Sequence, residues 1–335
     1  MKCTTLCSPS VFFTWTLLLP LPASADAILD GAKKEGQVVF YASMEAQSAQ
    51  RLVGRFETKY PFLKVDYTRI GSEKMSPRLI GEAQARKVRA DVVHQSGFDF
   101  YGVMQKGIFE SYNSPERAAL PPEYRDERGY WTINSATLNV IGYHKGQVPT
   151  AELPKSFWDL TAAKWKGQLL MDENESKWMA GMISYYGEAR AMDLMRKLAA
   201  QDIQFRAGHS LIQTLMAAGE RPITVVAFAN GVERLKKDGA PVDWVAPEVM
   251  IGLTFGLGLV KDAPHPNAGR LLIDFVLSRE GQQIIADVGY YAPRRDVSSP
   301  LIKQASKSKI VPLPMTLASR YNEYFQTYRK VMGLH

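Results

Sequence analysis

Short apolar runs and helical repeats alternate along the first part of the chain. Residues 38–41 and 90–93 are mainly apolar runs, which favour strands buried on both faces of a sheet. Residues 45–60 and 72–87 place apolar side chains at helical spacing, and residues 63–67 alternate as a strand does. This β-α-β-α-β succession predicts a parallel sheet covered by helices.

The middle of the chain predicts a second unit of the same kind. Two longer strand-like stretches, 131–143 and 250–260, flank this unit. A chain that leaves one unit, builds another and returns would form two Rossmann-like α/β lobes joined by a two-strand hinge. Shorter strands are expected at 168–171, 203–205, 223–227 and 242–245, and helices from 156 and over 177–187, 188–200, 210–218, 230–237, 265–278, 280–288 and 315–332.

The first 25 residues have the pattern of an export signal. Lys2 gives a positive start, Val11 to Leu21 form an apolar run too short to span a membrane, and Ala23-Ser24-Ala25 is a small-residue cleavage site. We therefore expect an exported protein cleaved near Ala25. The expected division is a signal peptide at 1–25, an N-lobe of 26–135 with 250–285, and a C-lobe of 136–249 with 286–335.

Composition excludes several classes of protein. The 335 residues are 46% hydrophobic and 22% charged, which is typical of a globular chain and not of a disordered one. Both cysteines lie in the first seven residues, so the expected mature chain has neither a disulfide nor a cysteine zinc site. The net charge of +7 has two possible explanations: it keeps the protein soluble, or it attracts an anionic ligand. The basic residues are scattered, and we expect no nucleic-acid partner.

Enzyme motifs are missing from the sequence. It contains no G-x-S-x-G nucleophile elbow, no G-K-[ST] of a phosphate-binding loop and no H-x-x-x-H metal pair. Asp172, Glu173 and Glu175 fit an acid/base pair or, equally, the solvated start of a helix. We therefore expect no catalytic residue and no bound metal.

Polar segments follow the expected strands, where the ligands of open α/β sheets bind. Ser43, Ser72 and Ser210 are expected helix N-caps, a role compatible with presenting backbone N–H groups to an anion. Arg69 and Lys177 fit anion partners or solvated charges, and Trp178 and Phe228 fit ligand stacking or core packing. The candidate ligand-binding residues are Ser43, Glu45, Arg69, Ser72, Gln95, Ser96, Glu173, Lys177, Trp178, His209, Ser210, Phe228, Asn230 and Tyr291.

A family resemblance rests on segments spread over most of the chain. They are 36–43, 89–93, 139–143, 239–245, 274–283, Tyr291-Ala292-Pro293-Arg294 and, most distinctively, Ala263-Pro264-His265-Pro266-Asn267-Ala268-Gly269-Arg270. With these segments the chain resembles type 2 periplasmic solute-binding proteins of ABC importers, in the branch with ferric-ion-, 2-aminoethylphosphonate- and sugar-phosphate-binding members. The resemblance implies a periplasmic monomer without a cofactor or enzymatic activity. Such a protein holds a small ligand between hinged lobes and delivers it to a membrane permease.

The ferric subgroup carries two adjacent tyrosines after the strand that corresponds to 223–227, and this chain has Phe228-Ala229 there. Tyr185-Tyr186 falls in an expected helix, and Tyr290-Tyr291 lies near the return to the second lobe. We therefore expect a small, polar, anionic ligand. Ferric iron as cargo, bound directly or as a chelate, is the alternative, and a periplasmic enzyme on the same fold is a remote one.

Overall fold

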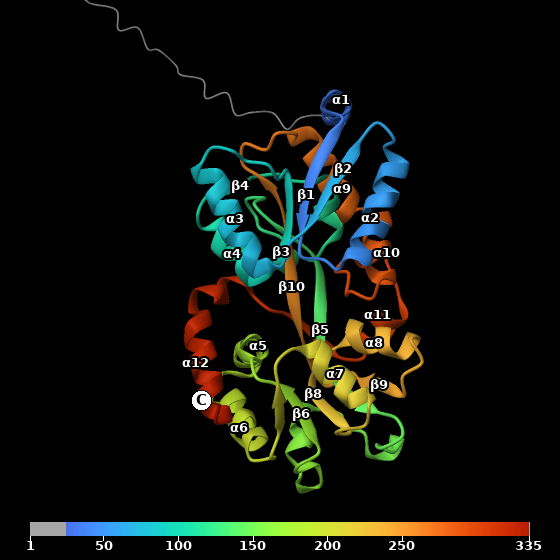
Figure 1. Cartoon of the computed structure of the whole chain (residues 1–335), viewed down its shortest axis with the longest axis vertical. Helices are drawn as coiled ribbons and strands as arrows, with labels where there is room; N and C mark the ends of the chain where they lie inside the picture. The colour runs from blue at the N-terminus through green and yellow to red at the C-terminus, as the bar shows by residue number, and fades with distance from the viewer. Residues whose placement is uncertain (1–24, 335) are drawn as a thin grey trace, which may run out of the picture.

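The computed structural model describes residues 25–334 and has two groups of helices and strands at the ends of an elongated molecule (Figure 1). Apart from Ala25, the expected signal peptide lies outside the described residues. The two groups, here called the N-lobe and the C-lobe, share a sheet with the strand order β2-β1-β3-β10-β5-β8-β6-β7. This mixed α/β architecture confirms the expected fold class.

In the N-lobe, β1 (Gln37–Ala42) pairs in parallel with β2 (Lys64–Arg69) and with β3 (Val92–Ser96). The crossover helices are α2 (Ala46–Lys59) and α3 (Ser72–Gln84), which confirms the predicted β-α-β-α-β succession. The other N-lobe elements are α1 (Ala25–Glu35), α4 (Gly97–Met104), β4 (Phe109–Glu110), the 3-10 helices η1 (Pro115–Ala119) and η2 (Pro122–Tyr124), α9 (Pro266–Leu277) and α10 (Arg279–Asp287).

In the C-lobe, β6 (Leu169–Asp172) pairs in parallel with β7 (Gln204–Arg206) and with β8 (Ile223–Phe228). The segment after Ser156 is a set of 3-10 turns and not the expected helix. Asp159 closes a capping box with Ser156, which fixes a tight first turn. The other elements are η3 (Thr150–Glu152), η4 (Phe157–Thr161), η5 (Ala163–Trp165), α5 (Ser176–Tyr186), α6 (Glu188–Ala199), α7 (His209–Ala217), α8 (Ala229–Lys237), β9 (Val242–Val245) and α11 (Pro300–Ala305).

Two long strands run through both lobes. The first half of β5 (Thr132–His144) pairs with β10 (Val249–Val260), and its second half pairs with β8 and β9. β10 reaches β3 at its far end. A bend of these two strands would therefore turn one lobe relative to the other.

A third segment also passes between the lobes, beside α4 (Figure 1). β11 (Lys309–Pro312) pairs with the C-lobe end of β10, and η6 (Met315–Arg320) follows it. Met315 is buried in a cluster with N-lobe core residues, and α12 (Tyr321–Met332) then returns to pack on α5 and α6. Residues 309–320, here called the strap, therefore tie the N-lobe to the C-lobe outside the hinge strands.

Each lobe is held together by buried apolar clusters on both faces of its strands. The N-lobe cluster around Phe40 and Phe56 extends along the chain to Val297. The boundaries of the lobes given above stay a prediction. Among the described residues, no helix combines the length and the apolar character needed to cross a membrane.

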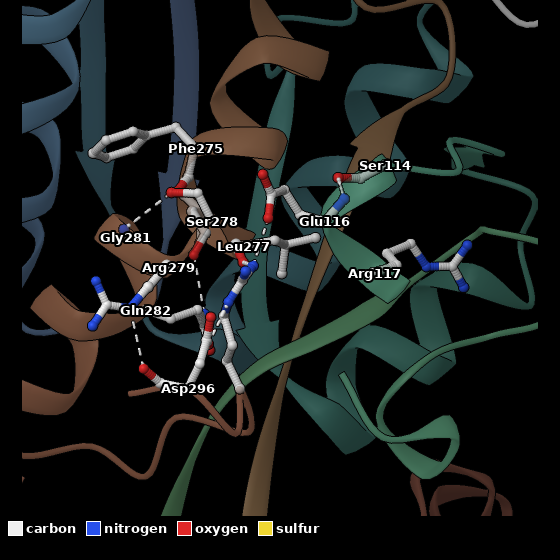
Figure 2. Close-up of polar contacts among 12 residues, drawn as sticks. Ser114, Glu116, Arg117, Phe275, Leu277, Ser278, Arg279, Gly281, Gln282 and Asp296 are labelled. Atoms are coloured by element: carbon white, nitrogen blue, oxygen red, sulfur yellow. Dashed lines mark hydrogen bonds and ion pairs between the residues drawn. The ribbon is translucent and has the colours of Figure 1, made fainter. Parts of the chain in front are cut away.

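A polar network joins the C-terminal end of α9 to the chain after α10 (Figure 2). Ser278 Oγ caps α10 by accepting the Gly281 N–H at 3.2 Å, and Arg279 Nε donates to the Asp296 carbonyl at 3.2 Å. The Arg294 guanidinium, 12% exposed, pairs with Glu116 and Asp296. This network fixes the chain just after Tyr290 and Tyr291, which return to the hinge.

Candidate functional site

The carboxyl ends of three N-lobe strands are joined at the boundary between the lobes. The Ser43 N–H donates to the His94 carbonyl at 2.9 Å, and the Ser96 N–H donates to Ser72 Oγ at 3.0 Å. Gln95, fully buried, donates from Nε2 to the Ser72 carbonyl at 2.7 Å. These contacts bring four predicted site residues together, and Gln95 supports the loop from behind.

Tyr290 fixes the outer N-lobe loops. Its ring packs edge-on against Phe255 of β10, with the centroids 6.1 Å apart. Its hydroxyl oxygen accepts a hydrogen bond from the backbone of Glu45. Burial raises the pKa of Tyr290, and the positive charge of Arg69 partly opposes this. The predicted residues Glu45 and Arg69, both exposed, therefore lie beside the same tyrosine.

Asp172 joins two loops of the C-lobe. Its Oδ1 accepts the Asn174 N–H and its Oδ2 accepts the Gly208 N–H, both at 2.8 Å. Tyr328 of α12 donates to the Asp172 carbonyl at 2.8 Å. The sequence allowed these three acids to form the solvated start of a helix. That alternative is wrong for Asp172 and Glu175, which are buried, and it fits only Glu173, which is exposed.

His209 lies at the first position of α7 and lies against two side chains, those of Phe228 and Glu175. Its ring stacks on Phe228, with the centroids 3.6 Å apart, and its Nε2 lies 3.4 Å from Glu175 Oε1. Burial lowers the pKa of His209 to about 4, although the Asp172 charge opposes the shift. Burial and then the Asp172 charge raise the pKa of Glu175. At neutral pH the pair therefore carries no net charge.

A cavity of about 260 Å³ opens between α2 of the N-lobe and α8 of the C-lobe. Glu45 and Arg51 line one wall, and Asn230 and Arg234 line the other. Asn230 Oδ1 is buried without a partner among the described residues. This cavity therefore has polar walls from both lobes, and it includes two predicted site residues.

The remaining predicted residues differ in their burial and in their contacts. Trp178 is fully buried in the C-lobe core, edge-on to Phe157. Of its two expected roles, this position fits core packing and not ligand stacking. Tyr291 pairs with Ala136 through the backbone and packs near Tyr124. Lys177 Nζ lies 5.7 Å from the ring centres of both Phe98 and Tyr321, Ser96 Oγ bonds to Asp99, and Ser210 is exposed.

None of the three serines expected as N-caps holds that position. Glu45 precedes α2, and Gly71 and Gly208 precede α3 and α7. Gly208 has φ +100°, a conformation that disfavours serine. Ser43 therefore joins two strands, Ser72 supports a neighbouring loop, and Ser210 is left exposed.

Two buried polar groups near the hinge were absent from the sequence prediction. His94 of β3 is fully buried, lies 5.1 Å from the Phe255 ring centre and has a pKa lowered by burial to about 4. Asn139 of β5, opposite Phe228, is buried with its amide unpartnered among the described residues. The signal for His94 was its place directly after the apolar pair Val92-Val93; Asn139 had no such signal.

Direct iron binding by tyrosinate finds little support in this geometry. Tyr290 bonds to the Glu45 backbone and Tyr291 bonds to Tyr124, and burial raises the pKa of both phenols. Within residues 25–334, no three His, Cys, Asp or Glu side chains are grouped so that they could hold a metal ion.

Comparisons with known proteins match this architecture. An uncharacterized protein of Haemophilus influenzae is 25% identical over 79% of each chain. The Trichodesmium protein IdiA (FutA), solved with iron and citrate ligands, superposes with a TM-score of 0.77 at 20% identity, over 90% of this chain and 100% of that one. The periplasmic binding protein AfuA of Actinobacillus pleuropneumoniae, solved with fructose-6-phosphate, gives 0.72 at 21% identity, over 90% and 99%.

At these identities the two structures establish the shared fold. The family model described as bacterial extracellular solute-binding protein matches residues 90–311, which is more than half of the chain and includes the hinge strands and the C-lobe loops. The chain therefore belongs to the bacterial extracellular solute-binding protein family.

Proposed function

We propose that this chain is the exported solute-binding component of an ABC importer. It captures a small, polar, anionic solute between its lobes and delivers it to the membrane permease. Export would follow from cleavage near Ala25, and the protein would act as a monomer without catalysing a reaction. The observation that carries the proposal is that each lobe directs polar strand ends toward the other across two shared strands.

The transport step follows from the energetics of a hinge. A solute that touches both lobes adds contacts in the closed form that the open form lacks, so binding shifts the population toward closure. Ser43, Glu45, Arg69, Ser72 and Ser96 would contribute from the N-lobe. His209, Ser210, Phe228 and Asn230, with Glu173 and Lys177 at the edge, would contribute from the C-lobe.

An anion fits these groups better than a neutral solute does. Arg69 and Lys177 supply positive charge, and the first N–H groups of α7 lack an intrahelical partner. Phosphate, phosphonate and carboxylate oxygens accept from such donors. The fructose-6-phosphate in the AfuA structure is an example of this chemistry on the same fold.

Ferric iron is the second candidate cargo, because the IdiA (FutA) structure holds iron with citrate. The partners of Tyr290 and Tyr291 favour a chelate over bare iron, since neither phenol is available without breaking a contact. A chelate such as ferric citrate would present carboxylates to the same donors.

A ligand panel tests the proposal. Isothermal calorimetry of the mature chain with fructose 6-phosphate, fructose, inorganic phosphate, citrate and ferric citrate should show saturable binding of an anion and none of fructose. Mass spectrometry and metal analysis of the purified protein would identify what it carries. Tight binding of fructose, or one iron per chain with a visible charge-transfer band and no chelator, would contradict the anion proposal.

A further inference from the structure

Glu175 is a buried carboxyl group in the C-lobe with an unused oxygen. It occupies the N-cap position of α5, is 2% exposed, and makes no side-chain cap. Its Oε1 has no hydrogen-bond partner among the described residues, although His209 Nε2 is only 3.4 Å away. A buried carboxylate in this position would be strongly disfavoured, whereas a neutral carboxylic acid is tolerated.

His209 lies beside this acid and is the more exposed of the two side chains. Its side chain is 20% exposed, and Phe228 of β8 holds the ring in place by stacking. Its Nδ1 is also buried without a partner within residues 25–334. Because this nitrogen is buried and Nε2 faces Glu175, a ligand can touch only the exposed part of the His209 ring, and it would sense the charge of the pair through that ring.

The groups around the pair disfavour a net negative charge. Asp172 of β6 already accepts two backbone N–H groups, and Tyr328 of α12 donates to the Asp172 carbonyl. On α5 itself, Lys177 lies over the rings of Phe98 and Tyr321. The charge of Asp172 favours a proton on Glu175 or on His209, and a ligand beside His209 would decide which of the two holds it.

We propose that Glu175 is a positioning residue that stores a proton for His209 and thereby makes the site select oxyanions. When an oxyanion contacts His209, the O–H bond of Glu175 breaks and its proton bonds to Nε2. The pair becomes carboxylate and imidazolium, and no proton is taken from solvent. The empty site stays neutral, and positive charge develops only where an anion stabilises it.

This inference rests on the proposed function, because it requires an anionic ligand beside His209. It adds a reason for selectivity: a neutral sugar of the same shape gives no stabilisation to the imidazolium, so the proton stays on Glu175. It also predicts that affinity is insensitive to pH while the proton is internal.

The first test measures the affinity of the mature chain for fructose 6-phosphate between pH 7 and 8.5, where the phosphate is a dianion. The wild-type dissociation constant should change by less than about threefold over this range. In Glu175→Gln, His209 must take its proton from solvent. Its affinity should therefore fall about tenfold per pH unit, or about 30-fold overall. Glu188→Gln, an exposed carboxylate at the start of α6, is the matched control and should behave as wild type.

A second measurement uses the wild-type chain alone. The ¹⁵N chemical shifts of the His209 ring should report a neutral imidazole at pH 7.5 and an imidazolium after fructose 6-phosphate or inorganic phosphate is added. Binding with His209 still neutral, or equal pH profiles for Glu175→Gln and wild type, would overturn the proton store and leave the proposed function intact. Failure of fructose 6-phosphate, inorganic phosphate, citrate and ferric citrate all to bind wild type would remove the oxyanion from the proposed function and this inference with it.

Discussion

The imidazole of His209 lies on the ring of Phe228, with 3.6 Å between the centroids and 24° between the planes. His209 begins α7 and Phe228 ends β8, so the stack connects the start of this helix to the end of this strand. The resemblance to the ferric-ion-binding branch would lead us to expect a tyrosine at position 228. Here the aromatic ring instead orients a histidine.

Replacing Phe228 with leucine should weaken binding of an anionic probe by about two- to tenfold, because an aromatic stack contributes about 0.5–1.5 kcal/mol. Calorimetry with fructose 6-phosphate measures this change. Phe325→Leu, a half-buried phenylalanine of α12, is the control and should leave the affinity unchanged. Equal affinities of wild type and Phe228→Leu would show that the stack does not orient the binding group.

Asp172 is expected to stabilise the fold as well as the site. In Asp172→Asn one of the two backbone donors, Asn174 or Gly208, would face an amide N–H₂ group and lose its acceptor. A buried donor without a partner costs about 1–3 kcal/mol, and the free energy of unfolding in urea should fall by that amount. Asp66→Asn, on the exposed side of β2, should change it by less than about 0.5 kcal/mol. A similar small loss for Asp172→Asn would argue against its role in joining the loops.

The apolar pattern predicted much of this fold because burial on both faces leaves long, unbroken runs. The hinge strands, expected at 131–143 and 250–260, span 132–144 and 249–260. By contrast, α4 was absent from the prediction because its sequence, Gly97 to Met104, is short and has one charged residue, Asp99, so that it shows no amphipathic period. The strand order depends on long-range pairing, which no local pattern encodes.

The predicted site was less complete for a related reason. The loops were found from their place after strands, but burial and side-chain direction decide what each residue does. Trp178 fills the core, Gln95 supports a loop, and Glu175, predicted only as one of three clustered acids, is buried behind His209. Such roles follow from packing between segments that are far apart in the sequence.

Gly97 should be needed where the strap meets α4. A methyl group there would lie 2.6 Å from Thr254 Oγ1 and 2.9 Å from Met315 Cγ. Gly97→Ala should therefore displace the strap and reduce the free energy of unfolding by about 1–3 kcal/mol. The control is Gly102→Ala in the same helix, where nothing lies within 4 Å, and it should stabilise the protein by up to about 1 kcal/mol. If both variants had a higher free energy of unfolding in urea than wild type, the strap would be able to move aside for the methyl group without cost.

His94 should make the fold sensitive to acid. Its pKa is lowered by burial to about 4 from an unfolded value near 6.5, so the folded state binds fewer protons than the unfolded state between these values. The contribution of His94 to the free energy of unfolding is therefore complete above about pH 6.5. It declines by about 3 kcal/mol as the pH falls to 4. In His94→Gln the side chain at this position cannot titrate. The free energy of unfolding of this variant should therefore depend less steeply on pH between 4 and 6.5 than that of wild type. An unchanged slope would show that His94 is protonated without cost in the folded protein.

Ser210 offers a change whose effects on stability and on binding have opposite signs. It is exposed in the first turn of α7, where a carboxylate interacts favourably with the helix dipole. Ser210→Asp should therefore leave the free energy of unfolding unchanged or raise it by up to about 1 kcal/mol. Beside an anionic ligand the same charge repels, and the affinity for fructose 6-phosphate should fall at least about tenfold. Thr214→Asp, one turn further along the exposed face, should have a much smaller effect on affinity. Equal affinities of Ser210→Asp and wild type would place the ligand away from the N-terminus of α7.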